Sequence, residues 1–231
     1  MIPLGILASS LAAGGPPPTL PSSPESQWQA ASAASSGNWT HTVGSAVGVG
    51  RLVVCSFVAI DDTGLTNTVT DSQSNTWTVT AGYAAASTIT RGVIAYAVLT
   101  TALTTSDTIT LVAVSSMTRA AVDVTVWDWT HATTAQGAWR PDSDTTQESD
   151  SADVSARAVV VGCFALSNPG RTTTVGSGWT GTTKVETTNG SGDRAVQGAY
   201  RTVDPSATGL IYDVGLSTSG SGTASWVAFV E

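Results

Sequence analysis

Five strand-like segments in the first half of the chain recur in the same order in the second half. RLVVCSFVAI, which starts at Arg51, matches RAVVVGCFAL, which starts at Arg157. Two further pairs are the segments that contain Trp77 and Trp179 and those that contain Tyr96 and Tyr200. The last two pairs are the segments that start at Asp107 and Thr208 and those that start at Val122 and Ala224. Because the separation stays between 101 and 106 residues and the order is kept, the pattern indicates a duplicated set of strands.

The whole body of the chain has the composition of short β-strands. β-Branched runs are separated by turn signals such as Asn168-Pro169-Gly170, and there is almost no helical periodicity. We expect strands at residues 51–60, 75–83, 91–99, 108–114, 120–129, 158–166, 179–187, 195–203, 210–214 and 224–230. The predicted fold class is all-β, a jelly-roll-like β-sandwich built from two related halves with an extended N-terminal arm.

Two architectures fit the repeat, namely two small tandem sandwiches or a single jelly roll made of two Greek-key halves. We favour the single domain, over residues 26–231, because each half offers few strands for a core of its own. Its halves are expected at about 45–136 and 154–231. The acidic segment 137–153 then becomes a crossover on the surface.

Charge and hydropathy exclude several classes of function. Hydrophobic residues make up 41% of the chain, enough for a core, whereas charged residues make up only 11%. The longest apolar runs are too short to span a membrane. The net charge is −8 and Lys and Arg form no cluster, so we expect neither nucleic acid nor an anionic membrane surface as a partner.

The two cysteines, Cys55 and Cys163, both lie in apolar runs. We expect two buried, reduced thiols that behave as small hydrophobic side chains. A disulfide between them is the alternative, and it would imply an oxidising compartment.

No catalytic or metal-binding pattern is found. His41 and His131 lie outside any ligand motif, and there is no GxSxG nucleophile turn. We expect no cofactor and no enzyme activity; a glycan-active enzyme stays an alternative because paired carboxylates meet only in space. Asp123 and Asp128 share a strand-like segment, where we expect Asp123 to point outward.

The acidic segment offers the one set of hard-metal ligands. It carries Asp142, Asp144, Glu148, Asp150 and Asp153, but their spacing does not match an EF-hand loop. We favour a solvated acidic loop over a calcium site.

The first 25 residues form the most unusual part of the chain. An uncharged apolar start, MIPLGILASSLAA, is followed by a proline-rich stretch typical of polyproline II. A cleaved signal peptide is the alternative, but the positive start of such peptides is missing. We expect a docking arm over residues 1–25 that buries its apolar side chains against a neighbouring subunit, namely Ile2, Leu4, Ile6, Leu7, Leu11 and Leu20.

Eight tryptophans are many for a chain with so few aromatic residues. Trp127 and Trp129 share one strand face, so both are inside or both outside. Trp139 lies in the polar crossover and is our candidate for a contact surface, for example one that stacks on a sugar ring of a host-surface glycan.

Four segments of the chain carry a family likeness: the start MIPLGILA, DSQSNTW at 71–77, YAVLTT…TSDTITL at 96–111 and RAVVVG at 157–162. In these segments the chain resembles the β-sandwich minor structural proteins, capsid or tail decoration subunits, of actinobacterial tailed bacteriophages. The resemblance implies a non-enzymatic virion subunit that is assembled in the host bacterial cytoplasm. Its partners would be major capsid or tail proteins and further copies of itself in a homo-oligomer. A carbohydrate-binding or adhesive surface module is the alternative.

Overall fold

The computed structural model describes residues 19–32, 37–61, 68–80, 83–84, 90–112, 117–131, 133–142, 144–167, 170–187 and 193–231. Every regular element in these ranges is a β-strand, and every strand pairing is antiparallel. The all-β prediction is confirmed, and the sheets stack as a β-sandwich does.

The first nine strands form two sheets, which we call the first half. A six-stranded sheet has the order β1-β9-β3-β7-β5, with β6 also paired to β7, and a three-stranded sheet has the order β2-β8-β4. The strands are β1 (Ser26–Ala31), β2 (Trp39–Thr42), β3 (Leu52–Asp61), β4 (Thr68–Asp71), β5 (Thr78–Val79), β6 (Tyr83–Ala84), β7 (Thr90–Val98), β8 (Thr108–Val112) and β9 (Met117–Trp127).

The remaining strands, the second half, repeat this plan. The six-stranded sheet has the order β10-β20-β13-β17-β15 with β16 beside β17, the three-stranded sheet has the order β11-β19-β14, and β12 and β18 form an additional pair. The strands are β10 (Thr133–Asp142), β11 (Thr146–Glu148), β12 (Ala152–Val154), β13 (Ala158–Leu166), β14 (Thr173–Val175), β15 (Thr180–Gly181), β16 (Val185–Glu186), β17 (Ala195–Val203), β18 (Ala207–Leu210), β19 (Asp213–Leu216) and β20 (Gly222–Val230).

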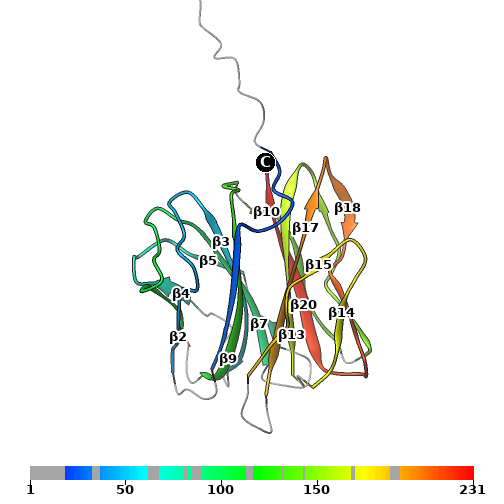
Figure 1. Cartoon of the computed structure of the whole chain (residues 1–231). Helices are drawn as coiled ribbons and strands as arrows, with labels where there is room; N and C mark the ends of the chain where they lie inside the picture. Colours follow the sequence, from blue (N-terminus) through cyan, green and yellow to red (C-terminus); the bar gives the residue numbers. More distant parts are fainter. Residues whose placement is uncertain are drawn as a thin grey trace, which may run out of the picture.

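Three buried apolar clusters hold the layers together. The first half encloses one cluster between its large and small sheets, and the second half encloses another. A third cluster, the shared cluster, lies between the two large sheets and draws residues from both halves. The small sheets therefore lie on the outside and the two large sheets back to back in the middle (Figure 1).

The central strands are apolar on both faces because both faces are buried. In β3, Val53, Cys55 and Phe57 point into the first half, whereas Leu52, Val54 and Val58 point into the shared cluster. A strand covered on both sides reads as a continuous hydrophobic run, which explains RLVVCSFVAI and its partner AVVVGCFAL in β13.

The contacts between the halves are reciprocal. β9 lies against β17 and β20 against β7, while β1 lies against β16 and β10 against β6. The aromatic contacts follow the same rule: Tyr96 meets Phe229 edge-on at 5.1 Å, and Trp127 meets Tyr200 edge-on at 5.3 Å. Equivalent strands thus exchange roles across the interface, as in an isologous contact between two subunits.

The segment 137–153, expected to be a surface crossover, is instead part of the second half. It contains the greater part of β10 and all of β11, and β12 begins within it. The connection between the halves is 128–132, between the end of β9 and the start of β10. Charged residues misled the sequence prediction because β10 and β11 are edge strands, where charges face solvent and discourage further pairing.

Gly137 lets β10 pair with β20 beside the buried side chain of Trp226. A Cβ at Gly137 would lie 2.0 Å from Nε1 of Trp226, so only glycine leaves room for that buried indole. The register of β10 against β20 shifts between Gly137 and Arg140, as a β-bulge does.

Several strands on the sheet edges were not predicted. β1, β2, β4 and β14 are short and rich in Ser, Thr and Gln, so they lack the apolar alternation that marks a strand in the sequence. The prediction that Trp127 and Trp129 lie on the same side is confirmed, since both are buried in the shared cluster.

Both cysteines are buried and form no disulfide, as predicted. Cys55 belongs to the cluster inside the first half, whereas Cys163 belongs to the shared cluster. Burial raises the pKa of both thiols, so both stay protonated at neutral pH.

Candidate functional site

The described part of the N-terminal arm, residues 19–25, lies at one end of the interface between the halves. We call this segment the arm root. Glu25 donates its backbone N–H to the carbonyl of Val126 at 2.8 Å, and its carboxylate pairs with Arg51 at 2.8 Å. Arg51 also pairs with Asp128, on the connection between the halves. This segment lies at the same end of the molecule as the C-terminus (Figure 1).

Leu20 is the one predicted arm residue that the structure describes. It is half-buried and packs against the shared cluster of its own chain. Ile2, Leu4, Ile6, Leu7 and Leu11 lie outside the described residues. Trp139 lies on the backbone of β10, but its side chain is also outside the described part.

The turn DSQSNTW is held together by its own polar side chains. The Asp71 carboxylate accepts the Trp77 indole N–H at 2.7 Å and the backbone N–H of Gln73 at 2.8 Å. The side-chain oxygen of Asn75 accepts the backbone N–H groups of Thr100 and Thr101, both at 2.8 Å. The motif that contributes to the family resemblance is therefore a structural turn.

Asp107 closes the same end of the first half. Its carboxylate accepts hydrogen bonds from Ser72 at 2.6 Å, from Gln73 at 2.7 Å and from the backbone of Thr104 at 2.7 Å. These bonds lower the pKa of Asp107, which favours its ionised form at neutral pH. A carboxylate hydrogen-bonded in this way stabilises the turn.

Asp123 is the buried carboxylate of the interface. It is 1% exposed, and its Oδ1 accepts the side-chain amides of Gln27 and Gln29, each at 3.0 Å. Its Oδ2 has no hydrogen-bond partner among the described residues, and the nearby hydroxyl of Thr182, from the second half, donates instead to the carbonyl of Gly198 at 2.8 Å. The expectation that Asp123 points outward is wrong, because the second large sheet covers the face of β9 that a lone sheet would leave to solvent.

A glycine in the opposite sheet makes room for this carboxylate. A Cβ at Gly198 of β17 would lie 2.1 Å from Oδ2 of Asp123. Burial raises the pKa of Asp123, and the hydrogen bonds from Gln29 and Gln27 oppose that rise. Asp123 is thus hydrogen-bonded within its own sheet by Gln27 and Gln29, while its Oδ2 lies against Gly198 of the opposite sheet, so the two large sheets approach each other closely here.

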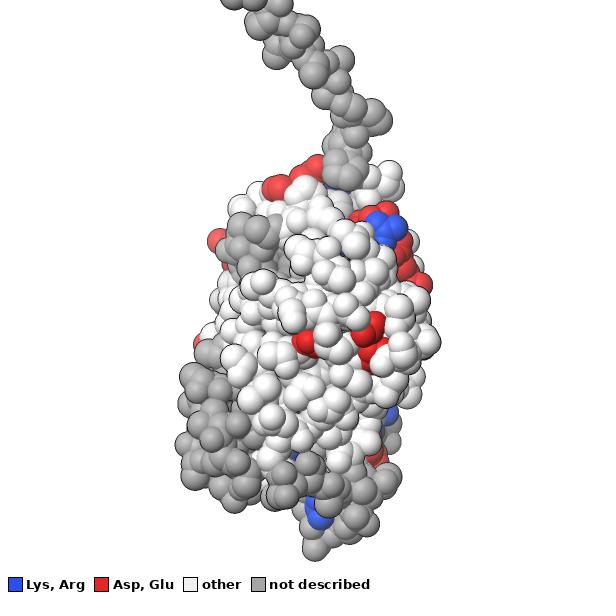
Figure 2. Space-filling model, turned by 90° about the vertical axis from the view of Figure 1, so that its left-hand side faces the viewer, with Lys and Arg blue, Asp and Glu red and all other residues white. Residues whose placement is uncertain are grey.

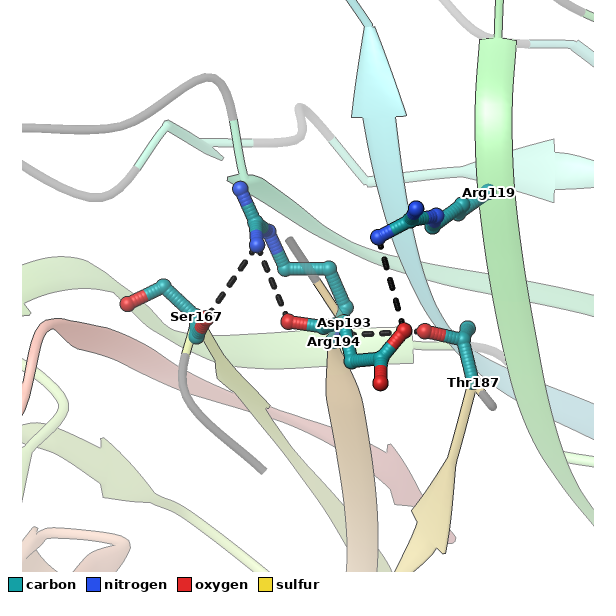
Figure 3. Close-up of polar contacts among 5 residues, drawn as sticks. All are labelled: Arg119, Ser167, Thr187, Asp193 and Arg194. Atoms are coloured by element: carbon teal, nitrogen blue, oxygen red, sulfur yellow. Dashed lines mark hydrogen bonds and ion pairs between the residues drawn. The ribbon is translucent and has the colours of Figure 1, made fainter. Parts of the chain in front are cut away.

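A second polar cluster joins the halves at the opposite end of β3 from Arg51 (Figure 3). Arg119 of β9 pairs with the carboxylate of Asp193 at 3.4 Å. The buried Arg194 donates from Nη1 to the carbonyls of Ser167 at 3.1 Å and Asp193 at 2.9 Å, and its backbone N–H bonds to Thr187 at 2.8 Å. Burial, followed by the nearby Arg119, lowers the pKa of Arg194. These contacts close the interface between the halves at this end.

His41 is a buried imidazole in an apolar setting. It lies on β2, is 6% exposed and stacks on Trp39 with ring centroids 5.1 Å apart. Neither ring nitrogen has a hydrogen-bond partner among the described residues. Burial lowers the pKa of His41 to about 4, so the ring is neutral at pH 7.

The acidic residues of 137–153 are spread over strands and turns. Asp153 accepts the backbone N–H of Gly209 at 2.8 Å, and Glu148 pairs with Arg140 at 3.6 Å. Within the part of the chain that the structure describes, no three His, Cys, Asp or Glu side chains gather as they would around a metal ion.

Two surface depressions are lined by described residues. One, of about 450 Å³, lies along 170–173 and is lined by the charged side chains of Arg171, Lys184 and Glu186. The other, of about 300 Å³, lies where the halves meet, and none of the described residues that line it is Asp, Glu, Lys or Arg. We call this second depression the junction groove; its lining residues are Leu52, Thr76, Thr78, Tyr96, Ala97, Val98, Thr130, His131 and Phe229.

Comparisons with protein-family models, with curated proteins and with solved structures each find no match. No helix that could cross a membrane occurs in the described ranges.

Proposed function

We propose that this chain is a non-enzymatic structural subunit of a tailed-bacteriophage virion. In this proposal it is a capsid decoration, minor capsid or minor tail protein that docks through residues 1–25. Its partners are capsid or tail proteins and further copies of itself.

The attached root of the arm is the observation that carries this proposal. Leu20 packs on the shared cluster, and Glu25, Arg51 and Asp128 form a chain of ion pairs beside it. The segment that precedes Thr19 therefore starts from a defined position on the body. An apolar, uncharged segment that starts from such a position can dock the whole body in one orientation.

The outer surface of the first half suits a particle exterior. Figure 2 views the molecule from the side of β2 and β4, and few charged residues appear there. Thr40, Thr110 and Thr70 lie side by side across the three strands, with the first two hydroxyls 2.8 Å apart. Neutral hydroxyl groups hydrate well and offer little charge for unspecific binding.

We also propose that the two halves are related by duplication and together make up one jelly-roll-like β-sandwich. The matching strand orders of the large and small sheets support this relation, and so do the reciprocal contacts across the shared cluster. A duplicated dimer interface would explain why neither half exposes its large sheet.

The test is incorporation into particles. Virions that lack this subunit would be complemented with the full chain, with a chain lacking residues 1–18, and with a chain in which Ile2, Leu4, Ile6, Leu7 and Leu11 are all replaced by Ser. We expect both variants to fold normally and to be missing from purified particles.

The deletion spares Leu20 and Glu25, so the contacts of the arm root are kept. A matched control replaces Ser9 and Ser10 with Ala in the same segment and should incorporate as the wild type does. Normal incorporation of the two arm variants would refute docking through the arm.

A further inference from the structure

The junction groove has a rigid wall on the side of the connection between the halves. Trp129 is buried and donates its indole N–H to the carbonyl of Phe229 at 2.7 Å. The ring of His131 lies against Trp129, with centroids 4.4 Å apart. The imidazole therefore lines the groove from a position that both halves determine.

The floor of the groove is apolar, and its rim carries hydroxyl groups. Leu52 and Phe229 are 1% exposed, and Tyr96 meets Phe229 edge-on. The exposed residues Thr76, Thr78 and Thr130 lie around this floor. Val98, one of the few large apolar side chains with substantial exposure among the described residues, is 39% exposed at its edge.

We propose that the junction groove binds a neutral sugar ring, such as the terminal residue of a glycan. A sugar ring has an apolar C–H face that packs on aromatic and aliphatic side chains, and hydroxyl groups that exchange hydrogen bonds with hydroxyls and an imidazole. The described lining has both kinds of group, and no Asp, Glu, Lys or Arg is among its residues. The volume of about 300 Å³ suits a small ligand.

The other depression lacks this chemistry. There the ammonium group of Lys184 is paired with Glu186 at 2.5 Å, and Arg171 lines the same surface. The site proposed here also differs from one centred on Trp139, because it uses Tyr96, His131 and Phe229. It is independent of the docking arm, so failure of one proposal leaves the other standing.

The experiment is an amide NMR titration of the full chain with neutral sugars at millimolar concentration: methyl mannoside, maltose, lactose, cellobiose and N,N′-diacetylchitobiose. We expect saturable shifts for at least one sugar, confined to residues 76–78, 96–98 and 130–131. Thr78→Val and His131→Ala should each weaken binding by about tenfold, because each removes a hydrogen-bonding group from the wall.

Two controls separate folding from binding. Thr40→Val is the same substitution as Thr78→Val but lies on β2 of the outer three-stranded sheet, so this variant should bind as the wild type does. Thermal melting shows whether each variant folds. If Thr78→Val and His131→Ala fold and bind every sugar normally, the site lies elsewhere and the proposal is wrong. It is equally overturned if no sugar gives saturable shifts, or if a peptide of residues 1–13 fills the groove and the sugars do not.

Discussion

The two halves place different polar groups at one equivalent position of the same plan. One inward residue of β2 is His41, opposite Ile109, and the inward residue of β11 is Gln147, opposite Val214. The amide of Gln147 donates to the carbonyls of Asp144 at 2.8 Å and Gly220 at 3.0 Å. The imidazole of His41 has no such partner in the described structure.

The difference teaches that a shared strand order does not dictate what the core contains. The turn around Gly220 approaches β11 closely enough to accept a hydrogen bond, so the side-chain N–H groups of Gln147 are satisfied there, although its Oε1 has no partner in the described structure. In the first half the corresponding group sits among Trp39 and Phe57 and must stay neutral. We therefore expect the halves to respond differently to acid and similarly to loss of apolar packing.

The largest expected effect is the loss of a central aromatic ring from either half. Phe57 and Phe164 are 0% and 1% exposed and point from β3 and β13 into the cluster of their own half. Phe57→Ala and Phe164→Ala should each lower the free energy of unfolding by about 3–5 kcal/mol, through lost burial and the cavity left behind. Chemical denaturation measures both.

Val49→Ala is the matched control, since Val49 is 62% exposed, and it should change stability by less than about 0.5 kcal/mol. Similar losses for the two phenylalanines support equivalent cores. If the free energy of unfolding falls by less than about 1 kcal/mol in one of the two variants, the cores of the two halves are not equivalent.

The next effect is confined to the first half and depends on pH. The pKa of His41 is about 4 in the folded chain against 6.5 when unfolded, so the unfolded state binds a proton first as pH falls. The stability present above pH 6.5 should decline between pH 6.5 and 4 by about 3 kcal/mol. His41→Leu should remove this part of the pH dependence, as measured by denaturation across that range.

His131→Leu is the control for this effect, and it should keep the decline in stability that His41 causes between pH 6.5 and 4, because His41 is unchanged. An unchanged slope in His41→Leu would show that the buried ring does not cause the acid sensitivity.

The third effect tests how the halves fit together at Asp123. Gly198→Ala should destabilise by about 1–3 kcal/mol, since its Cβ would lie 2.1 Å from the carboxylate. Ser225 of β20 lies opposite Cys163 of β13, just as Asp123 of β9 lies opposite Ser56 of β3. Asp123→Ser therefore gives the first half the residue that the second half has at this position. Gly198→Ala should cost less in that background, and a double-mutant cycle by denaturation measures the difference.

Gly215→Ala is the control, because the nearest atom to its added Cβ is 3.6 Å away. Fully additive costs of Asp123→Ser and Gly198→Ala would mean that the close contact between the sheets does not matter.

The smallest expected difference is the one between the two tryptophans Trp77 and Trp179. The indole N–H of Trp77 bonds to the Asp71 carboxylate at 2.7 Å, whereas that of Trp179 bonds to the carbonyl of Ile211 at 3.0 Å. Trp77→Phe should lower stability by about 1.5–3 kcal/mol and Trp179→Phe by about 0.5–1.5 kcal/mol, since a bond to a charged acceptor is the stronger one. Thermal melting would rank them, and the reverse order would contradict this reasoning.

The sequence was most reliable where burial is complete. β3, β7, β9, β13, β17 and β20 all lie within or close to predicted segments, because strands covered on both faces must be apolar throughout. It was least reliable at sheet edges such as β1 and β10, where one side faces solvent and polar residues are tolerated.

The candidate site could be predicted only in fragments. Tyr96, His131 and Phe229 line one groove although they are far apart in the sequence, and no local pattern marks them. Matching by letters also slips by one residue: it aligns Cys55 with Val161, yet Cys55 points into its own half and Val161 into the shared cluster. A slip of one residue reverses the face of a strand, so the roles of the two cysteines needed the structure.

By itself, the sequence determined that this chain is all-β, that its central strands are buried and that its two cysteines are packed as hydrophobic side chains. Those properties follow from local composition and the two-residue period of a strand. Only the tertiary structure decided that the large sheets lie back to back, that Asp123 is enclosed between them and that 137–153 belongs to the second half. These outcomes depend on which faces meet, and contacts between distant segments leave no periodic trace in a sequence.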